Sequence, residues 1–343
     1  MSTAKPILIA GSGLSSLLLA QSLKLSKIPF KIFERDASFD KCGQTTGAGY
    51  TAYNAVSGEE TEHIVPENLS SRDGKIVGIA RGDMRKVFAE NCEPYIEWAK
   101  NVTGYELTDD GVRAIFSDGS KSIEGSLLVG GEGIYSKIAK QLSGGKLKVY
   151  DTGAKGIHGQ APTTAFKQLG EGVFRLRDDS GPDGSVFIIT NVRAGDMDNP
   201  DVKFGWTMGG KPAADLAKSI TQNWHPRFRP LFENMDESEA AFWKITCSTP
   251  SGVPEWKNEP RVTVIGDAAH SMTPAGGLGA NTACQDSALL GKLLREAGGY
   301  GPDVTAAYEK EMRVYASKAV NESYTLAKKA FGVDIDEENT PTV

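Results

Sequence analysis

The chain has 343 residues, enough for roughly two domains of ordinary size. Its content of 39% hydrophobic and 24% charged residues is typical of a globular protein, and its formal charge of −6, without any basic run, argues against nucleic acid as a partner. Four scattered cysteines form no CxxC pair, which predicts reduced thiols and neither a disulfide framework nor a metal site.

The N-terminal residues predict a strand rather than an export signal. Residues 1–6 lack the charged region and the cleavage site of a signal peptide. The apolar stretch from Ile7 to Leu25 is interrupted by glycine, serine and glutamine, so we expect no membrane span, which needs about 20 apolar residues. These features predict a cytoplasmic protein.

Residues 7–34 have the pattern of a βαβ unit. Ile7–Ala10 is a continuous apolar run, as in a parallel strand buried on both faces, and Leu14–Leu25 has an apolar face at helical spacing. Phe30–Phe33 predicts a second strand that ends at Glu34. Such units almost always form a right-handed crossover.

The segment Gly11-Ser12-Gly13-Leu14-Ser15-Ser16 stands between this strand and helix, where a dinucleotide fingerprint belongs. Gly11 suits the tight turn, Gly13 lets a pyrophosphate approach the backbone, and Ser16 takes the place of the third glycine. A carboxylate at Glu34 accepts hydrogen bonds from ribose hydroxyls and repels a 2′-phosphate, so FAD or NAD fits better than NADP. A plain βα turn followed by a solvated acid is the alternative interpretation.

The middle of the chain predicts further short elements. Residues 36–80 indicate loops with a short strand or two, and Arg81–Glu93 predicts a helix that Pro94 ends or kinks. The other expected elements are the strands Tyr105–Leu107, Arg113–Phe116, Ser122–Ile123, Leu127–Val129, Val173–Leu176, Val186–Ile189, Lys203–Trp206 and Val262–Ile265, and helices over 213–223, 281–296 and 303–329.

The segment Gly266–Ser287 carries a second cofactor motif. Asp267 directly follows a predicted strand, and a Pro/Gly-rich loop then leads into a helix. A carboxylate there suits the ribityl hydroxyls of a flavin, and N–H groups of residues 276–281 suit the negative charge of a reduced flavin's pyrimidine edge. A Gly-rich connection before an amphipathic helix is the alternative, and His270 is expected to have a structural hydrogen bond. Two such motifs at opposite ends of the chain predict one ligand held by both.

The sequence resembles the class A flavoprotein monooxygenases, the p-hydroxybenzoate hydroxylase-like family, over most of the chain except roughly residues 151–252. The resemblance implies an α/β fold in which a Rossmann-like FAD-binding domain holds an inserted, β-sheet-rich substrate domain. It implies three parts: residues 1–150 and 253–343 for FAD binding, and 151–252 for the substrate. The matching segments are the two motifs, Glu34-Arg35, Arg81-Gly82-Asp83-Met84-Arg85, Asp151–Gly159 and Tyr308–Arg313 with Ser317 and Ser323.

The two motifs and the resemblance together nominate the site residues. Pro274, Gly276 and Gly277 are expected to flank the reacting face of the flavin, and no metal ligand is expected. The nominated FAD-binding residues are Gly11, Gly13, Leu14, Ser15, Glu34, Arg35, Arg81, Glu132, Gly133, Gly266, Asp267, Gly277, Leu278, Gly279, Ala280 and Asn281.

The resemblance implies a monooxygenase that inserts one oxygen atom of O2 into a small organic substrate through a flavin C4a-hydroperoxide, with NAD(P)H as the reductant. Hydroxylation and epoxidation both stay open, as do the substrate and the oligomeric state. The middle fingerprint departs from the family pattern, because Glu132 replaces an aspartate and Ala139 an arginine. This departure motivates the alternative of an FAD-dependent oxidoreductase or redox-neutral flavoenzyme on the same fold; a binding module without activity is a second alternative.

Overall fold

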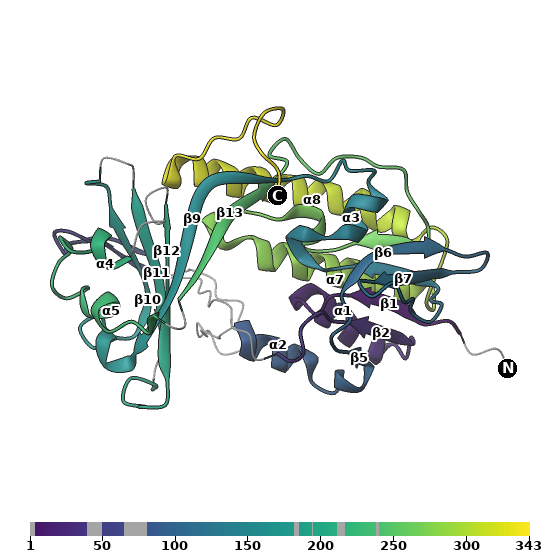
Figure 1. Ribbon diagram of the computed structural model, residues 1–343, viewed down its shortest axis with the longest axis horizontal. Helices are drawn as coiled ribbons and strands as arrows, with labels where there is room; N and C mark the ends of the chain where they lie inside the picture. The colour runs from purple at the N-terminus through teal and green to yellow at the C-terminus, as the bar shows by residue number, and fades with distance from the viewer. Residues whose placement is uncertain are drawn as a thin grey trace.

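The computed structural model describes residues 4–39, 50–64, 81–181, 185–193, 195–210, 217–237 and 240–343. Two sheets lie at opposite ends of the molecule, a five-stranded parallel sheet and a seven-stranded sheet (Figure 1). A small ladder of β6 (Val102–Leu107) and β7 (Val112–Phe116) accompanies the parallel sheet. The predicted fold class, a Rossmann-like α/β part with a separate sheet-rich part, is confirmed.

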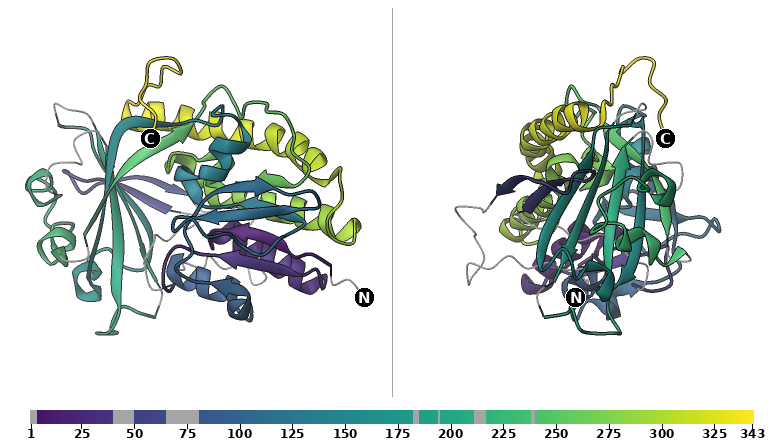
Figure 2. Two further views of the ribbon diagram at one scale, coloured as in Figure 1. Left: turned by 45° about the vertical axis from the view of Figure 1, so that its right-hand side comes forward. Right: turned by 90° about the vertical axis from the view of Figure 1, so that its left-hand side faces the viewer.

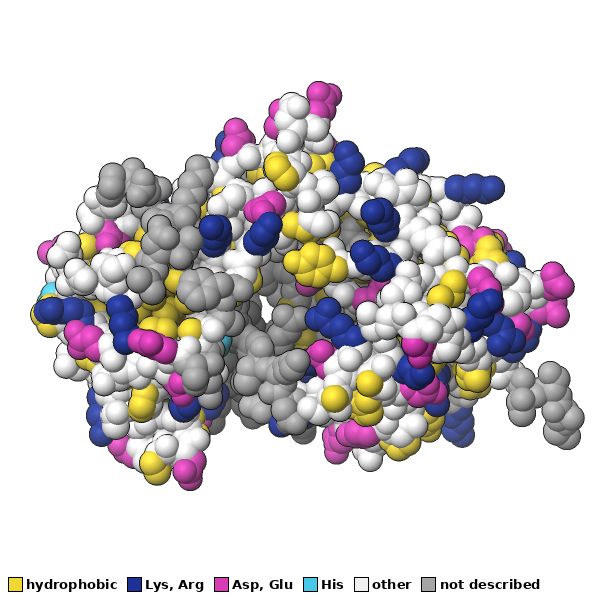
Figure 3. Space-filling view, in the orientation of Figure 1, with side chains coloured by type: hydrophobic (Ala, Val, Ile, Leu, Met, Phe, Trp, Pro, Cys, Tyr) yellow, Lys and Arg dark blue, Asp and Glu magenta, His cyan; other side chains and the backbone are white. Residues whose placement is uncertain are grey.

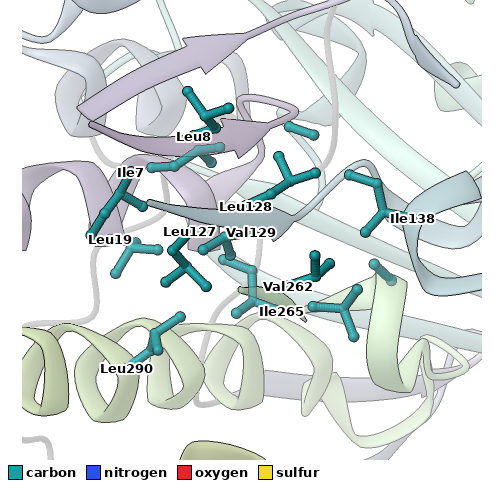
Figure 4. Close-up of a cluster of buried hydrophobic side chains, with 14 of the residues drawn as sticks. Ile7, Leu8, Leu19, Leu127, Leu128, Val129, Ile138, Val262, Ile265 and Leu290 are labelled. Carbon is teal, nitrogen blue, oxygen red and sulfur yellow. The ribbon is translucent and has the colours of Figure 1, made fainter. Parts of the chain in front are cut away.

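The parallel sheet has the order β14-β8-β1-β2-β5, and its strands β1 and β8 are continuous apolar runs that are buried throughout. Helices α1 (Leu14–Leu25) and α7 (Gly279–Glu296) pack together, and Leu19 and Leu290 lie beside the strand side chains of the core (Figure 4). Helix α8 (Val304–Phe331) packs against α7. The strands are β1 (Ile7–Ala10), β2 (Phe30–Phe33), β5 (Ile96–Glu97), β8 (Leu127–Gly130) and β14 (Val262–Val264).

The seven-stranded sheet has the order β13-β9-β12-β11-β10-β3-β4. The short helices α4 (Ala217–Ile220) and α5 (Pro230–Glu233) cover its outer face, and its other face is turned toward the parallel-sheet part (Figures 1 and 2). The strands are β3 (Tyr50–Asn54), β4 (Glu60–Ile64), β9 (Val149–Pro162), β10 (Gly172–Asp178), β11 (Val186–Val192), β12 (Lys203–Gly210) and β13 (Ala241–Ser248). Because β3 and β4 precede residue 151, the sheet combines strands from two of the three predicted parts; that division of the chain stays a prediction.

The sequence did not indicate β9 and β13. Buried and more exposed positions alternate over most of strand β9, but several of the buried ones are glycine, alanine or threonine, so the hydropathy of the sequence shows little alternation. Two of its glycines are covered by tryptophan rings: a Cβ atom at Gly156 would lie 2.4 Å from Trp243, and one at Gly159 would lie 2.3 Å from Trp206. Glycine is therefore required at these two positions because tryptophan rings from other strands occupy the space of a side chain. No local sequence pattern reveals such partners.

Two other elements differ from expectation. The predicted strand Ser122–Ile123 is wrong, because residues 121 and 125 form only isolated bridges. There Ser122 Oγ accepts a hydrogen bond from the Ala114 N–H at 2.9 Å, in place of a regular ladder. The helix expected over 213–223 is described only as α4, since residues 213–216 lie outside the described residues. No helix in the described ranges is long and apolar enough to cross a membrane.

Candidate cofactor site

The turn between β1 and α1 has the geometry of a phosphate site. Gly11 has a φ of +83°, and a Cβ atom there would lie 2.6 Å from the Gly131 carbonyl oxygen, so only glycine fits. Gly13 forms the N-cap of α1 without a side-chain cap, which leaves the first N–H groups of the helix without a side-chain acceptor. Such an N-terminus favours an anion.

Glu34 lies at the end of β2 with only 6% of its surface exposed. Its Oε2 accepts a hydrogen bond from the Ser12 N–H at 2.7 Å, and Oε1 accepts one from the Asp36 N–H at 2.9 Å. Burial raises the pKa of this carboxyl, but hydrogen bonds from Asp36 and Ser12 and the charge of Arg85 lower it more, so the pKa lies below its ordinary value. Glu34 is thus anionic at neutral pH and, with more than one acceptor site per oxygen, can also accept ribose hydroxyls.

Arg85 is a site residue that the sequence analysis did not assign. It belongs to α2 (Arg81–Ala89), donates from Nη2 to Ser12 Oγ at 2.9 Å, and lies 3.6 Å from Glu34. It therefore ties α2 to the β1–α1 turn. The sequence did hold a signal for this role, because Arg85 lies four residues after Arg81 on a predicted helix and so shares its face. The side chain of Arg81 itself lies outside the described residues, so its FAD contact stays a prediction.

The other residues that were nominated for FAD binding near the β1–α1 turn differ in their exposure. Ser15 is buried, Leu14 is half-buried, and Arg35 is an exposed side chain 3.7 Å from Asp36. Gly133 has a φ of +78° and lies beside Glu132 in the loop after β8.

The Glu132 side chain contacts the start of a helix, whereas the sequence analysis nominated it for FAD binding. Its Oε1 accepts a hydrogen bond from the N–H of Ile138 at 3.1 Å, at the start of α3 (Lys137–Leu142). The buried Oε2 has no hydrogen-bond partner in the described part of the chain, and burial raises the pKa of this carboxyl. Glu132 thus caps a helix here, and its contact with the cofactor stays a prediction.

The second motif touches the first. Gly266 has a φ of +63°, and a Cβ atom there would lie 2.8 Å from Ser15 Oγ. Ser287 Oγ donates to the Ser15 carbonyl oxygen at 2.6 Å. Asp267 begins α6 (Asp267–His270), is half-buried, and receives no hydrogen bond from the described residues, so its carboxylate is available to a ligand hydroxyl.

A buried hydrogen-bond network around Asp286 supports the Gly266–Asp267 turn. One oxygen of Asp286 accepts hydrogen bonds from the Gly266 N–H at 2.6 Å and His270 Nε2 at 2.7 Å, and the other accepts one from the Tyr315 hydroxyl at 2.6 Å. His270 thus has the structural hydrogen bond that was expected. The role of Asp286 was missed, although its place on the buried side of a predicted helix, three residues after Ala283, was a usable signal.

The loop before α7 leaves space and hydrogen-bond donors for a ligand. Pro274, Gly276 and Gly277 are exposed, and a Cβ atom added at Gly277 or Gly279 would meet nothing within 4 Å. Helix α7 has no side-chain cap, so the N–H groups at its start have no side-chain acceptor. The candidates around that start are the half-buried Leu278 and Gly279 and the exposed Ala280 and Asn281.

These features fit FAD. An uncapped helix and a buried carboxylate would hold the diphosphate and the adenosine ribose, and Asp267 and the start of α7 would hold the ribityl chain and the flavin's pyrimidine edge. In the space-filling view, the surface is hollowed between the two parts of the molecule (Figure 3). A flavin held by both motifs would extend toward that hollow.

Known proteins with similar sequences carry related names. The dual O-methyltransferase/FAD-dependent monooxygenase of Cercospora beticola is 27% identical over 96% of this chain and 46% of its own length. The FAD-dependent monooxygenase thnD of Trichoderma harzianum is 27% identical over 84% of this chain and 82% of its own length. The chain spans about half the length of the first curated relatives that it matches.

Solved structures and a family model agree on the fold. The crystal structure of Klebsiella pneumoniae HpxO complexed with FAD and uric acid has a TM-score of 0.74 at 21% identity, over 94% of this chain and 87% of that one. The sequence model of the FAD-binding-domain family matches residues 81–323, which is more than half of the chain. With two touching motifs that fit the cofactor, the chain belongs to the FAD-binding-domain family.

Proposed function

We propose that the chain is an FAD-dependent monooxygenase that inserts one oxygen atom of O2 into a small organic substrate by hydroxylation or epoxidation. The single observation that carries the proposal is the contact between the two motifs at Ser15 and Gly266, which forms one extended site for FAD. The monooxygenase names of relatives that match more than four fifths of the chain support the reaction class.

Each part of the site has a proposed role in this reaction. When bound, FAD supplies the two-electron redox chemistry and the activation of O2. Glu34 orients the adenosine ribose, and Asp267 orients the ribityl chain. The uncapped start of α7 stabilises negative charge on the flavin's pyrimidine edge. Pro274 and the exposed Gly276–Gly277 backbone leave the reacting face open to the substrate.

The electron donor is proposed to be NAD(P)H. Glu132 bears on this proposal. It accepts a hydrogen bond at the start of α3, in the segment whose sequence departs from the family pattern. The Ile138 and Ala139 N–H groups are bonded to the side chains of Glu132 and Ser136, and Ala139 supplies no guanidinium, so we propose that the coenzyme is held without a bidentate arginine contact in this segment. A cytoplasmic location is proposed with it.

The test uses the purified, FAD-loaded protein. Oxidation of NADH and of NADPH is followed with a panel of aromatic and isoprenoid compounds, and products formed under 18O2 are examined by mass spectrometry. The expected result is one labelled oxygen atom per product molecule. Coenzyme oxidation or substrate conversion without label in any product would instead indicate an FAD-dependent oxidoreductase or a redox-neutral enzyme.

A further inference from the structure

One face of α8 supports the loop that precedes α7. Ala275 of this loop packs against the apolar cluster that contains Ala327 of α8. A Cβ atom at Gly276 would lie 2.8 Å from the Leu326 side chain, so the loop backbone approaches the helix closely. Because residues three and four apart share a side of a helix, Ser323 lies on the same face as Leu326 and Ala327.

Two buried hydroxyl groups fasten the loop to this face. Ser323 has none of its surface exposed, and Thr273 of the loop has 2%. The Ser323 hydroxyl donates to the Thr273 carbonyl oxygen at 3.0 Å. Because a serine hydroxyl has one proton, the Thr273 hydroxyl is the donor toward Ser323, whose hydroxyl and carbonyl oxygens lie 2.8 and 3.2 Å from Thr273 Oγ1. Thr273 Oγ1 in turn accepts a hydrogen bond from the Ala275 N–H at 3.3 Å.

These hydrogen bonds form a directed chain. It leads from the Ala275 N–H through the hydroxyls of Thr273 and Ser323 and back to the Thr273 carbonyl oxygen, and we call this chain the hydroxyl clamp. Each hydroxyl proton in it has an acceptor, and neither side chain is open to solvent. Removal of either hydroxyl would leave buried polar groups short of a partner, which is more costly than the loss of an exposed hydrogen bond.

The other side of the loop is open. Pro274, which directly follows Thr273, is exposed, and a Cβ atom at Gly277 would meet nothing within 4 Å. This is the side on which the flavin is proposed to lie. The loop would then stand between α8 and the cofactor, so the hydroxyl clamp determines how closely the loop backbone and the start of α7 approach the flavin.

We propose that Ser323 is a positioning residue of the flavin site. Through the hydroxyl clamp it holds the Pro274–Gly277 backbone and the start of α7 where they stabilise the negative charge of the reduced flavin. Hydrogen-bond donors and helix dipoles stabilise such charge best when they are fixed in place beforehand. The proposal rests on the proposed function, because it assigns a residue that tunes the flavin of the same site.

Ser317 provides a matched control on the same helix. Its hydroxyl oxygen accepts a hydrogen bond from the Val253 N–H at 2.9 Å, so it also fastens a loop to α8. That loop belongs to neither cofactor motif. Ser317→Ala therefore removes a comparable hydrogen bond and leaves the hydroxyl clamp intact.

Hydrogen–deuterium exchange of the FAD-loaded protein reports on the loop directly. Peptides that contain residues 272–279 should exchange about threefold to tenfold faster in Ser323→Ala than in the wild type, the factor that corresponds to one lost hydrogen bond. Thr273→Val also removes the acceptor of the Ala275 N–H and should have at least the same effect. Thr273→Ser keeps the hydroxyl and should stay close to the wild type, and Ser317→Ala should leave these peptides unchanged.

The midpoint potential of the bound FAD is a readout that a merely structural role would not change. In Ser323→Ala the affinity for reduced FAD should fall about threefold more than the affinity for oxidised FAD. For a two-electron couple this lowers the potential by about 14 mV. Equilibration with a reference dye measures the potential, which Ser317→Ala and Thr273→Ser should leave unchanged.

The outcomes separate this proposal from the proposed function, because neither measurement needs turnover. Unchanged FAD content shows that a variant is folded, and if Ser323→Ala loses FAD, the comparison of Thr273→Val with Thr273→Ser decides in the same way. The proposal is overturned if Ser323→Ala leaves the loop exchange or the potential at the wild-type value, or if Ser317→Ala changes both equally. Faster exchange and a lower potential, together with unlabelled products under 18O2, would support the positioning role and reject the monooxygenase.

Discussion

Asp286 supports Gly266 directly: the Gly266 N–H donates to Asp286 Oδ2 at 2.6 Å, although the two residues are 20 positions apart. The same oxygen lies 2.7 Å from His270 Nε2, and both side chains are almost completely buried. The turn that carries Asp267 is thus supported by a buried aspartate–histidine pair. Its geometry depends on residues that face away from the ligand.

Asp286→Asn should destabilise the fold strongly. Asparagine keeps an acceptor for the Gly266 N–H but removes the charge that faces the buried His270, and breaking a buried pair typically costs about 3–5 kcal/mol. Urea unfolding of the FAD-free protein measures the change in the free energy of unfolding. Asp303→Asn, at the exposed start of α8, is the matched control and should have little effect. Equal stability of Asp286→Asn and the wild type would contradict the supporting role of the pair.

His270 should make stability depend on pH. Burial by itself lowers the pKa of this imidazole, but the charge and hydrogen bond of Asp286, with the charge of Asp267, raise it more, so the pKa lies above its ordinary value of 6.5. A raised pKa in the folded state contributes stability that is fully present below pH 6.5 and is lost as the pH rises through the folded-state value. The stability advantage of the wild type over His270→Gln should therefore shrink as the pH rises above 6.5 and through the raised folded-state pKa. Urea unfolding across this range checks it, and a constant difference would exclude the linkage.

Glu34→Gln should weaken FAD binding. The change removes the negative charge next to the Ser12 N–H and leaves a poorer acceptor for ribose hydroxyls, a loss of about 1–3 kcal/mol in the free energy of binding. Quenching of FAD fluorescence on titration with the FAD-free protein gives the Kd. Glu97→Gln serves as the control, because Glu97 ends the neighbouring strand β5 but pairs with Lys31 at 2.8 Å. Equal losses in both variants would show that Glu34 has no special part in binding.

Asp267→Ala should also weaken FAD binding, by about 1–3 kcal/mol, because this carboxylate has no partner among the described residues and is free for a ribityl hydroxyl. The stability of the FAD-free protein should change much less than in Asp286→Asn. The same fluorescence titration and urea unfolding separate the two effects. Full FAD occupancy of the variant at low flavin concentration would refute the placement of the ribityl chain.

Gly279→Ala should separate stability from cofactor binding. An added Cβ would meet nothing within 4 Å, and alanine is the better helix former, so the FAD-free protein should be unchanged or up to about 0.5 kcal/mol more stable. FAD affinity should fall about tenfold, since the methyl group would enter the space next to the exposed start of α7. Thermal unfolding and FAD titration measure both quantities, with Gln285→Ala on the exposed side of α7 as the control. Unchanged affinity would place the cofactor elsewhere.

Elements with local signals could be predicted from the amino-acid sequence. The apolar runs of β1 and β8 predict buried parallel strands, and Gly11 predicts the tight turn that its φ of +83° confirms. These signals arise from residues a few positions apart, so they can be recognised without partners. The fold class and the class of cofactor followed from them.

Contacts between distant segments could not be predicted from the sequence and became apparent only in the folded structure. It placed Gly266 against Ser15, joined Arg85 to Ser12, and set Trp243 over Gly156 in a strand that has no recognisable pattern. Such contacts depend on how sheets and helices pack against one another. The packing energy arises from residues far apart in the sequence, so no single segment predicts it.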